Sequence, residues 1–270
     1  MIMPAPFYPG KQDEKSSELP KLNRQEFIDA LTDLGKQRYH SLHPFHKLLH
    51  TGKLSFKQVQ AWALNRFYYQ WSIPRKDLTL MARINDVKLR LEWRSRVIDH
   101  EGDIDGSGGI KRYLQLCETL KLDLDYVKSC KGILPGTKFA VDAYVNFVQE
   151  KSLLEGIASS LTEIYAPAIH QERIAGLSKY YDWADDYALA YFKKRINQAR
   201  RDVEFGREWV INNAITRSDQ EAVLNAVKFK TEVLWAQLDA LYYAYIDPGN
   251  IPPGAFIPEN NNDQENEQTS

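Results

Sequence analysis

A histidine beside a glycine-rich string is the first residue in this sequence that could carry out acid–base chemistry. His100 stands between Asp99 and Glu101 in RVIDHEGDIDGSGG. Imidazole can accept or donate a proton near pH 7, because its ordinary pKa lies close to neutrality. The glycines match neither a G-x-G-x-x-G fingerprint nor a P-loop, so we expect them to end one helix and begin the next. We therefore predict that His100 transfers protons.

A run of four histidines raises the question of a metal site. His40, His43, His46 and His50 lie within the string YHSLHPFHKLLH. Pro44 argues against one regular helix through the run, and Pro167 separates the second candidate pair, Glu163 and His170. A carboxylate-bridged di-iron bundle uses Glu-x-x-His pairs, and the sequence contains none. We expect no catalytic metal, although the spacing is compatible with a haem bound by one histidine of the run.

Three predicted helices place a cation on an apolar face. On a helical wheel, Arg66 is the centre of a largely apolar face that also carries Gln70, although the opposite face is apolar too. Lys230 is surrounded by apolar residues on its own helix, and Tyr191 and Arg195 share a face of small residues. A buried ammonium costs several kcal/mol unless it is paired or faces a wet pocket, and snorkelling is the alternative. These cations indicate a pocket for an anion with several carboxylates.

The composition excludes several classes of partner. The chain has 270 residues with a formal net charge of −1, so nothing indicates general attraction to nucleic acid or to an anionic membrane. We find no secretory signal and no apolar stretch that could span a bilayer. Cys117 and Cys130 are not in metal-ligand spacing. We expect a reduced, cytoplasmic setting.

The hydrophobic pattern is helical almost throughout, and it predicts one all-α domain, a single compact bundle of about seven to eight helices. We expect a flexible arm over 1–20, the catalytic domain over 21–247, and a flexible acidic, Asn-rich tail over 248–270. Asn23 and Ser55 are candidate helix caps, and the second of these helices should end before Pro74. A long helix is expected over 185–213, and a capping box at 218–221 should open the last one, to about residue 246.

Several strings, in order, resemble the pyrroloquinoline-quinone (PQQ) synthase family. They are YHSLHPFH, NRFYYQWSIPRKD, RVIDHEGD, LPGTKFAVDAYVNF, SSLTEIYAPAIHQ, QARRDVEFG and FKTEVLWAQLDA, and the likeness as a whole runs from about residue 24 to residue 245. The resemblance implies a haem-oxygenase-like all-α fold, a homodimer and an oxidase with neither metal nor organic cofactor. The implied reaction closes the last ring of AHQQ, a polycarboxylate quinone precursor. It removes eight electrons to O2, which is the co-substrate, with release of H2O2 and formation of PQQ.

The resemblance also implies roles for individual residues. The implied substrate-binding residues are His40, Arg66, Tyr69, Gln70, Arg96, Tyr144, Glu163 and Lys230, and His170 belongs to the same pocket. His100 is implied as the principal acid–base residue, with Tyr191 and Arg195 holding oxygen or peroxide beside it. Two positions depart from the family pattern: Phe205 stands where histidine is common, and Lys138 stands where arginine is familiar.

Three alternatives stay open at this point. The first is an iron-dependent haem-oxygenase-like oxidase, which bound iron would reveal. The second is a thiamin-processing relative, which would need a cysteine nucleophile that neither Cys117 nor Cys130 matches. The third is a carrier that binds PQQ without catalysis, which has no need for the set of His100, Tyr191 and Arg195.

Overall fold

The computed structural model describes residues 19–104 and 106–258, with the side chain of residue 200 left aside. Its elements are α1 (Arg24–Arg38), η2 (His40–Leu42), α2 (Pro44–His50), α3 (Phe56–Met81), α4 (Val87–Glu101), α5 (Gly109–Thr119), α6 (Leu124–Ser129), α7 (Pro135–Glu150), α8 (Leu153–Ala158), η3 (Ser159–Tyr165), α9 (Ala166–Tyr180), α10 (Ala190–Asn213) and α11 (Arg217–Tyr245). The elements η2 and η3 are 3₁₀ helices.

The prediction of an all-α protein is confirmed, since the described residues contain helices and no strand. The helix number is somewhat higher than the expected seven to eight. The additional helices are the short ones α2, α6 and α8, of 7, 6 and 6 residues. Helices this short leave a weak hydrophobic period in the sequence, because one or two turns carry only a few apolar positions.

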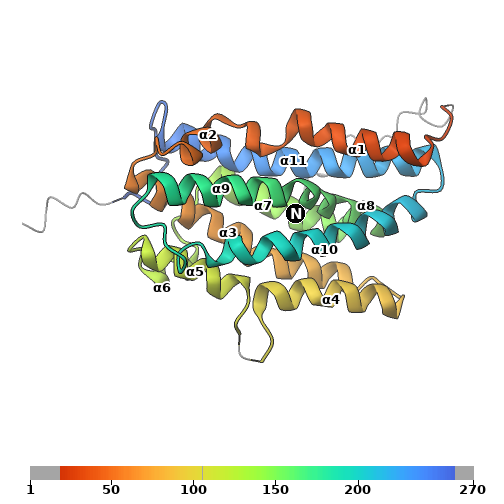
Figure 1. The fold of residues 1–270 in the computed structure, drawn as a ribbon, viewed down its shortest axis with the longest axis horizontal. Helices are drawn as coiled ribbons and strands as arrows, with labels where there is room; N and C mark the ends of the chain where they lie inside the picture. Colours follow the sequence, from red (N-terminus) through yellow and green to blue (C-terminus); the bar gives the residue numbers. More distant parts are fainter. Residues whose placement is uncertain (1–18, 105, 259–270) are drawn as a thin grey trace, which may run out of the picture.

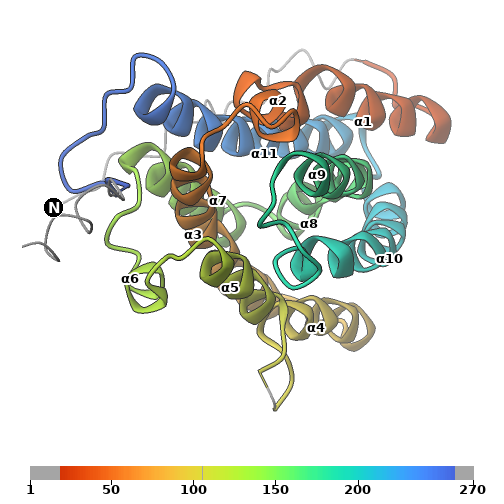
Figure 2. The same ribbon diagram turned by 60° about the vertical axis from the view of Figure 1, so that its left-hand side comes forward.

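The long helices form a bundle in which segments distant in sequence lie side by side. Figure 1 shows α1 and α11 along one side of the molecule and α4 along the other, with α3, α9 and α10 between them. The turned view in Figure 2 shows α3 next to α7 and α9 next to α10. The 3₁₀ helix η3 packs against both α10 and α11. This arrangement brings residues from five α-helices and from both 3₁₀ helices to one interior region.

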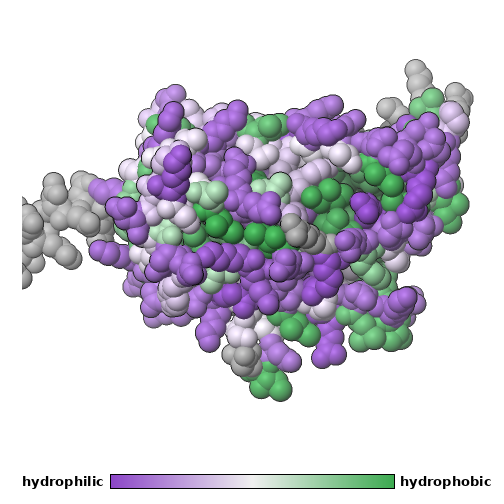
Figure 3. Space-filling model, in the orientation of Figure 1, coloured by the Kyte–Doolittle hydropathy of each residue, from purple (hydrophilic) through white to green (hydrophobic). Residues whose placement is uncertain are grey.

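Hydrophobic and hydrophilic side chains form alternating strips on one face of the molecule. Figure 3 shows a strip of hydrophobic residues between rows of hydrophilic ones, in the part of the face where α9 and α10 lie in Figure 1. None of the described helices is both long and apolar enough to cross a membrane.

The helix capped by Ser55 does not end before Pro74, contrary to our prediction. It continues to Met81, with Pro74 inside it. A proline inside a helix costs about 3 kcal/mol because it removes one N–H and crowds the preceding turn. Here the next turns bury Lys76, Asp77 and Leu80, which are at most 2% exposed. Tertiary packing after the proline therefore outweighs the local penalty.

The predicted start of the last helix was also wrong. Thr216 is its N-cap, and a capping box joins Thr216 to Asp219, two residues before the box expected at 218–221. The helix expected over 185–213 begins at Ala190, because residues 186–189 form turns. The caps at Asn23 and Ser55 are confirmed, each with a complete capping box.

Two clusters of apolar side chains form the core. The first is centred on α3, α5 and the C-terminal part of α11, and it includes the buried Cys117. The second joins α1, α7, η3 and the N-terminal part of α11. Both cysteines are free. The two clusters leave between them the polar region in which the site lies.

The expected arm over 1–20 lies outside the described residues except for 19–20, and most of the expected tail lies outside them too. The first part of that tail, residues 248–258, is described. The Phe256 N–H donates to the Gly132 carbonyl, and the Tyr245 hydroxyl donates to the Phe256 carbonyl at 2.8 Å. Ala255 is buried. This segment therefore packs against the helices.

Candidate active site

A cavity of about 50 Å³ is lined by residues of both apolar clusters, among them Tyr191 of the first and Tyr69 and Leu234 of the second. Residues of η2, α3, α4, η3, α9, α10 and α11 line it. Of the predicted site residues, those in its wall are His40, Arg66, Tyr69, His100, Glu163, His170, Tyr191 and Arg195. The structure thus brings together residues that are up to 155 positions apart in the chain.

The four remaining predicted residues lie behind this wall: Gln70, Arg96 and Lys230 contact residues of the wall, and Tyr144 contacts Lys230. The Tyr191 hydroxyl donates to Gln70 Oε1 at 2.7 Å, and Arg96 Nη2 donates to Glu163 Oε2 at 2.9 Å. Lys230 Nζ donates to the Tyr69 hydroxyl at 2.8 Å. The same ammonium lies 3.4 Å from the centre of the Tyr144 ring. Gln70, Arg96, Tyr144 and Lys230 are all buried, so these contacts position the side chains that face the cavity.

His100 presents one free nitrogen in this buried region. It lies at the C-terminal end of α4, and its Nδ1 is 3.1 Å from the Arg96 carbonyl oxygen. A carbonyl only accepts, so Nδ1 carries the hydrogen and Nε2 keeps its lone pair. Nε2 is buried and has no hydrogen-bond partner among the described residues. Burial and then the Arg195 charge lower the pKa of His100 to about 4. The imidazole is therefore neutral at pH 7 and can accept a proton.

The glycines after His100 allow the chain to pass very close to it. Gly102 ends α4 with φ at 92°, a backbone conformation that favours glycine. A Cβ at Gly108, the N-cap of α5, would lie 2.3 Å from the His100 carbonyl oxygen. A Cβ at Gly109 would lie 3.2 Å from the Tyr191 ring. The expectation that these glycines separate two helices is confirmed, and Gly109 lies close to both His100 and Tyr191.

One half of the site, which we call the paired half, contains two arginines and two carboxylates. Glu163 lies 2.9 Å from Arg96 Nη2 and 3.2 Å from Arg195 Nη2. Asp202 lies 3.5 Å from Arg96 Nη1 and 3.7 Å from Arg195 Nη1. Burial alone would raise the pKa of Glu163, but Arg96 and Arg195 hold it at about 2. The pKa values of both arginines are raised despite burial, chiefly by Glu163.

The other half, which we call the unpaired half, contains Arg66, Arg173 and Lys230. None of them forms an ion pair with a carboxylate in the described part of the chain. Arg66 lies over the Tyr69 ring at 4.0 Å, and Arg173 donates to His46 Nε2 at 3.1 Å. Burial and the Arg66 charge lower the pKa of Arg173 to about 10 and that of Lys230 well below its ordinary value. Buried cations without counter-charges favour the binding of an anion.

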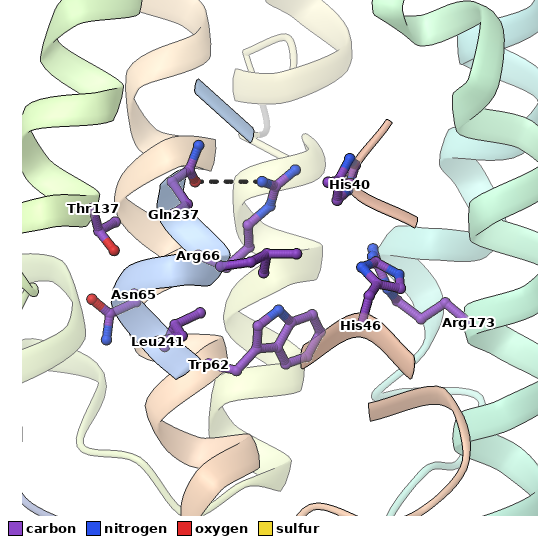
Figure 4. A pocket seen from close by; sticks show the side chains of 10 residues that line it. His40, His46, Trp62, Asn65, Arg66, Thr137, Arg173, Gln237 and Leu241 are labelled. Carbon is purple, nitrogen blue, oxygen red and sulfur yellow. Dashed lines mark hydrogen bonds between the residues drawn. The ribbon is translucent and has the colours of Figure 1, made fainter. Parts of the chain in front are cut away.

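A side pocket of about 10 Å³ adjoins the main cavity and shares His40, Arg66 and Arg173 with it. Figure 4 shows the Arg66 side chain extending between Gln237 and His40, with Nη1 3.5 Å from Gln237 Oε1. Thr137 Oγ1 and His40 Nδ1 are buried there, and neither has a hydrogen-bond partner within residues 19–104 and 106–258. The volume suits about one water molecule. The side pocket thus extends the polar lining beyond Arg66.

The imidazoles beside the unpaired half are neutral. Burial, followed by the charges of neighbouring arginines, lowers the pKa values of His40, His46 and His170 well below 6.5. The rings of His40 and His46 lie 5.2 Å apart, and those of His46 and His50 lie 4.1 Å apart. Pro44 begins α2, so His40 lies on a different helical element from His46 and His50 although its ring is near that of His46. Among the described residues, no group of three or more His, Cys, Asp or Glu side chains is placed to hold a metal ion.

The helical wheel left open which face of the Arg66 helix is buried, and the structure buries most of both faces. Arg66 is half-buried and lines the cavity, whereas on the opposite face Ala61 and Leu64 are at most 1% exposed and Trp71 is 45% exposed. Lys230 is 1% exposed, so it does not reach solvent by snorkelling. Tyr191 and Arg195 line the cavity together.

Sequence reasoning missed Arg173, which lines both cavities. Arg173 lies one helical turn after His170, and this spacing was the signal that could have identified it. The sequence also did not single out Asp202, the second carboxylate of the paired half. Lys138 is exposed on α7 and lines neither cavity, and Phe205 packs against the second apolar cluster.

Comparison with known proteins identifies close relatives over most of the chain. The chain is 56% identical over 240 residues to pyrroloquinoline-quinone synthase of Rhodopseudomonas palustris strain TIE-1, covering 89% of this chain and 94% of the relative. It is also 56% identical over 234 residues to the protein of the same name from Rhizobium meliloti strain 1021, covering 87% and 91%. A 54% match over 256 residues is the bifunctional coenzyme PQQ synthesis protein C/D of Methylorubrum extorquens, covering 95% and 68%.

Solved structures share the fold at low sequence identity. A domain with a haem oxygenase-like fold from Shewanella denitrificans superposes with a TM-score of 0.66 at 12% identity, covering 86% of this chain and 96% of that chain. A TenA homologue from P. horikoshii superposes with a TM-score of 0.61 at 14% identity, covering 79% and 99%. The fold is therefore haem-oxygenase-like, as expected. The sequence profile of the TENA/THI-4/PQQC family matches residues 28–240, and the chain belongs to this family.

Proposed function

We propose that this protein is a PQQ synthase, an oxidase that needs no cofactor. It closes the last ring of AHQQ and removes eight electrons to O2, forming PQQ and releasing H2O2. The names of the relatives that are 56% identical support the assignment to PQQ biosynthesis. We further propose that it acts as a cytoplasmic homodimer on this small polycarboxylate, without a nucleic-acid or membrane partner.

The observation that carries this proposal is the imbalance of charge around the cavity. The cationic side chains there are Arg66, Lys76, Arg96, Arg173, Arg195 and Lys230, and the carboxylates are Asp77, Glu163 and Asp202. The cations thus outnumber the carboxylates two to one. A ligand that brings several carboxylates would balance this excess, because buried charges are stable only when they are paired.

The chemistry of O2 explains why a site without a cofactor can suffice. O2 is a triplet, so it accepts electrons one at a time, and an electron-rich quinol or carbanion of the substrate can supply them. Each O2 that leaves as H2O2 takes up two electrons and two protons. The task of the protein is therefore to move protons and to stabilise anions.

His100 and its neighbours fit that task. The free Nε2 of His100 would accept a proton from the bound substrate, leaving an electron-rich anion in the cavity. Arg66, Arg96 and Lys230 would stabilise the carboxylates and the developing enolate charge. Arg195, with Tyr191 and His170 beside it, would stabilise superoxide or peroxide and return protons to it.

Substrate binding requires side chains to move. The cavity of about 50 Å³ is smaller than the roughly 300 Å³ at which ligand pockets begin. Glu163 lines the cavity and contacts both arginines of the paired half. Substrate carboxylates would therefore compete with Glu163 for these arginines as the pocket opens.

Aerobic turnover of chelator-treated protein with AHQQ tests the proposal. We expect PQQ absorbance and H2O2 to appear together without added metal. Binding of PQQ without conversion of AHQQ would instead identify a carrier. Activity that returns only after addition of iron would identify an iron-dependent oxidase.

A further inference from the structure

Asp202 shares both arginines of the paired half with Glu163, but it uses different nitrogens. Arg96 and Arg195 each direct Nη2 to Glu163 and Nη1 to Asp202. The Asp202 Oδ2 atom lies 3.5 Å from Arg96 and 3.7 Å from Arg195, and the side chain is 2% exposed. A single carboxylate oxygen therefore faces both guanidinium groups.

The second oxygen of Asp202, Oδ1, accepts hydrogen bonds from Arg201 on the outer side of the site. Arg201 donates to Oδ1 through Nη2 at 2.7 Å and through Nε at 3.1 Å. Arg201 also donates to Asp99 Oδ2 at 2.5 Å. The carboxylate of Asp202 is thus fixed between an outer arginine that is half-exposed and the two inner ones.

The two carboxylates differ in their access to substrate. Glu163 lines the cavity, whereas Asp202 does not. A substrate carboxylate that enters the cavity can replace Glu163 at Arg96 and Arg195, but it cannot reach Asp202. Asp202 would then be the counter-charge that remains on both arginines while substrate is bound.

We propose that Asp202 is a positioning residue that keeps Arg96 and Arg195 in their reactive orientation during turnover. This inference rests on the proposed function. Asp202 touches neither substrate nor oxygen, so it acts through the two arginines. Geometry in the reacting complex depends on it, whereas attraction of the anionic ligand does not.

The substitution Asp202→Asn separates these two effects, because it keeps the shape and an acceptor for Arg201 but removes the charge. We expect kcat to fall at least tenfold. We expect the Kd for PQQ to stay the same or to decrease, since the site becomes more positive. A kcat within twofold of the unchanged protein would overturn the proposal. A Kd that rises in proportion to the loss of kcat would overturn it too, because it indicates general damage to the site.

Two further variants keep the test decisive if the asparagine variant folds poorly. Asp202→Glu retains the charge and moves it by one methylene. We therefore expect a kcat between those of the unchanged protein and Asp202→Asn, with unchanged affinity for PQQ. A kcat equal to that of the unchanged protein would overturn the proposal. Glu204→Gln removes the same charge from an exposed position on α10 and should change neither quantity. Failure of the unchanged protein to form PQQ would overturn the proposed function, whereas a normal unchanged protein with a normal Asp202→Asn variant would overturn only the role of Asp202.

Discussion

The paired and unpaired halves of the cavity hold the same type of side chain in opposite electrostatic states. Burial opposes the charge on Arg96 and on Arg173 alike, yet the pKa of Arg96 is raised and that of Arg173 is lowered to about 10. The difference is the presence of Glu163 and Asp202 beside Arg96 and the absence of a carboxylate contact to Arg173 in the described residues. The paired half is therefore organised before ligand binds, and the unpaired half has charge available for the ligand.

The boundary between the halves is where the reaction should take place. His100 lies next to the paired half through its hydrogen bond to Arg96, and His40 lies next to the unpaired half beside Arg66. An anionic ligand that spans both halves would have its carboxylates on Arg66 and Lys230 and its reacting carbons near His100. The contrast therefore predicts that some substitutions change catalysis, others stability and others affinity.

The largest expected effect is on turnover in His100→Asn. Loss of general acid–base catalysis lowers rates by about 10²–10⁴-fold, while the cations that bind PQQ are unchanged. We expect PQQ to bind with an affinity within about threefold of the unchanged protein, and the oxidation of AHQQ to stop partway. Rapid-scan absorbance and mass spectrometry of the stalled species measure this. Full conversion at the normal rate would remove His100 from the mechanism.

Glu163→Gln should remove the ion pairs that Glu163 forms with Arg96 and Arg195 and thereby lower stability. Removal of one partner from a buried ion pair leaves uncompensated charge and costs about 3 kcal/mol of unfolding free energy. Added PQQ should restore much of the loss, because its carboxylates replace the missing one. Denaturant titration with and without PQQ measures both quantities. Equal destabilisation in the two titrations would contradict the idea that ligand and Glu163 compete.

Lys230→Met should have the opposite signature, since it removes a cation that lacks a carboxylate partner. We expect the unfolding free energy without ligand to stay the same or to rise by about 1 kcal/mol. The affinity for PQQ should fall by about 2 kcal/mol, the value of a hydrogen bond to a charged group. Lys138→Met, on the exposed face of α7, is the matched control and should alter neither. Calorimetric titration would contradict us if both variants bound PQQ equally well.

Near pH 7 the smallest expected effect is the pH dependence of stability, which grows as the pH falls. In the unfolded chain each histidine binds a proton near pH 6.5, whereas folded His100 does so only near pH 4 and folded His50 near pH 3. The unfolded state therefore holds more protons in this window, and stability falls as the pH falls below about 6.5, by about 1.4 kcal/mol per pH unit for each such imidazole. Bound PQQ should make the slope shallower, because its negative charge favours the protonated rings. Denaturant titrations at several pH values, with and without PQQ, measure both slopes.

Much of the site could be predicted because helical periodicity is a local property. The wheel alone placed Arg66 and Lys230 on apolar faces, and both are buried or half-buried in the site. His100 stood out by its residue type beside the glycine-rich string, and the resemblance supplied the place of Glu163 in the substrate pocket. The sequence did not identify Arg173 and Asp202, because a charged residue on a helix is usually solvated. Only the packing of α9 and α10 against their neighbours shows that these two residues are buried.

The errors in helix boundaries have the same origin. A local rule placed a helix end before Pro74, but the burial of Lys76 and Asp77 carries α3 through it. At the start of α11, two adjacent capping-box patterns were available, and the sequence does not say which one the preceding turn will select. Both choices depend on contacts between distant segments.

The burial of the two free cysteines has a consequence for the durability of the protein. Burial raises the pKa of the Cys117 thiol to about 12 and raises that of Cys130 as well. At pH 7 the thiolate fraction of Cys117 is then on the order of 10⁻⁵, and it is the thiolate that peroxide oxidises. Under the proposed reaction H2O2 forms inside the protein, and Cys117 would then stay in the unreactive thiol form, protected from oxidation during turnover.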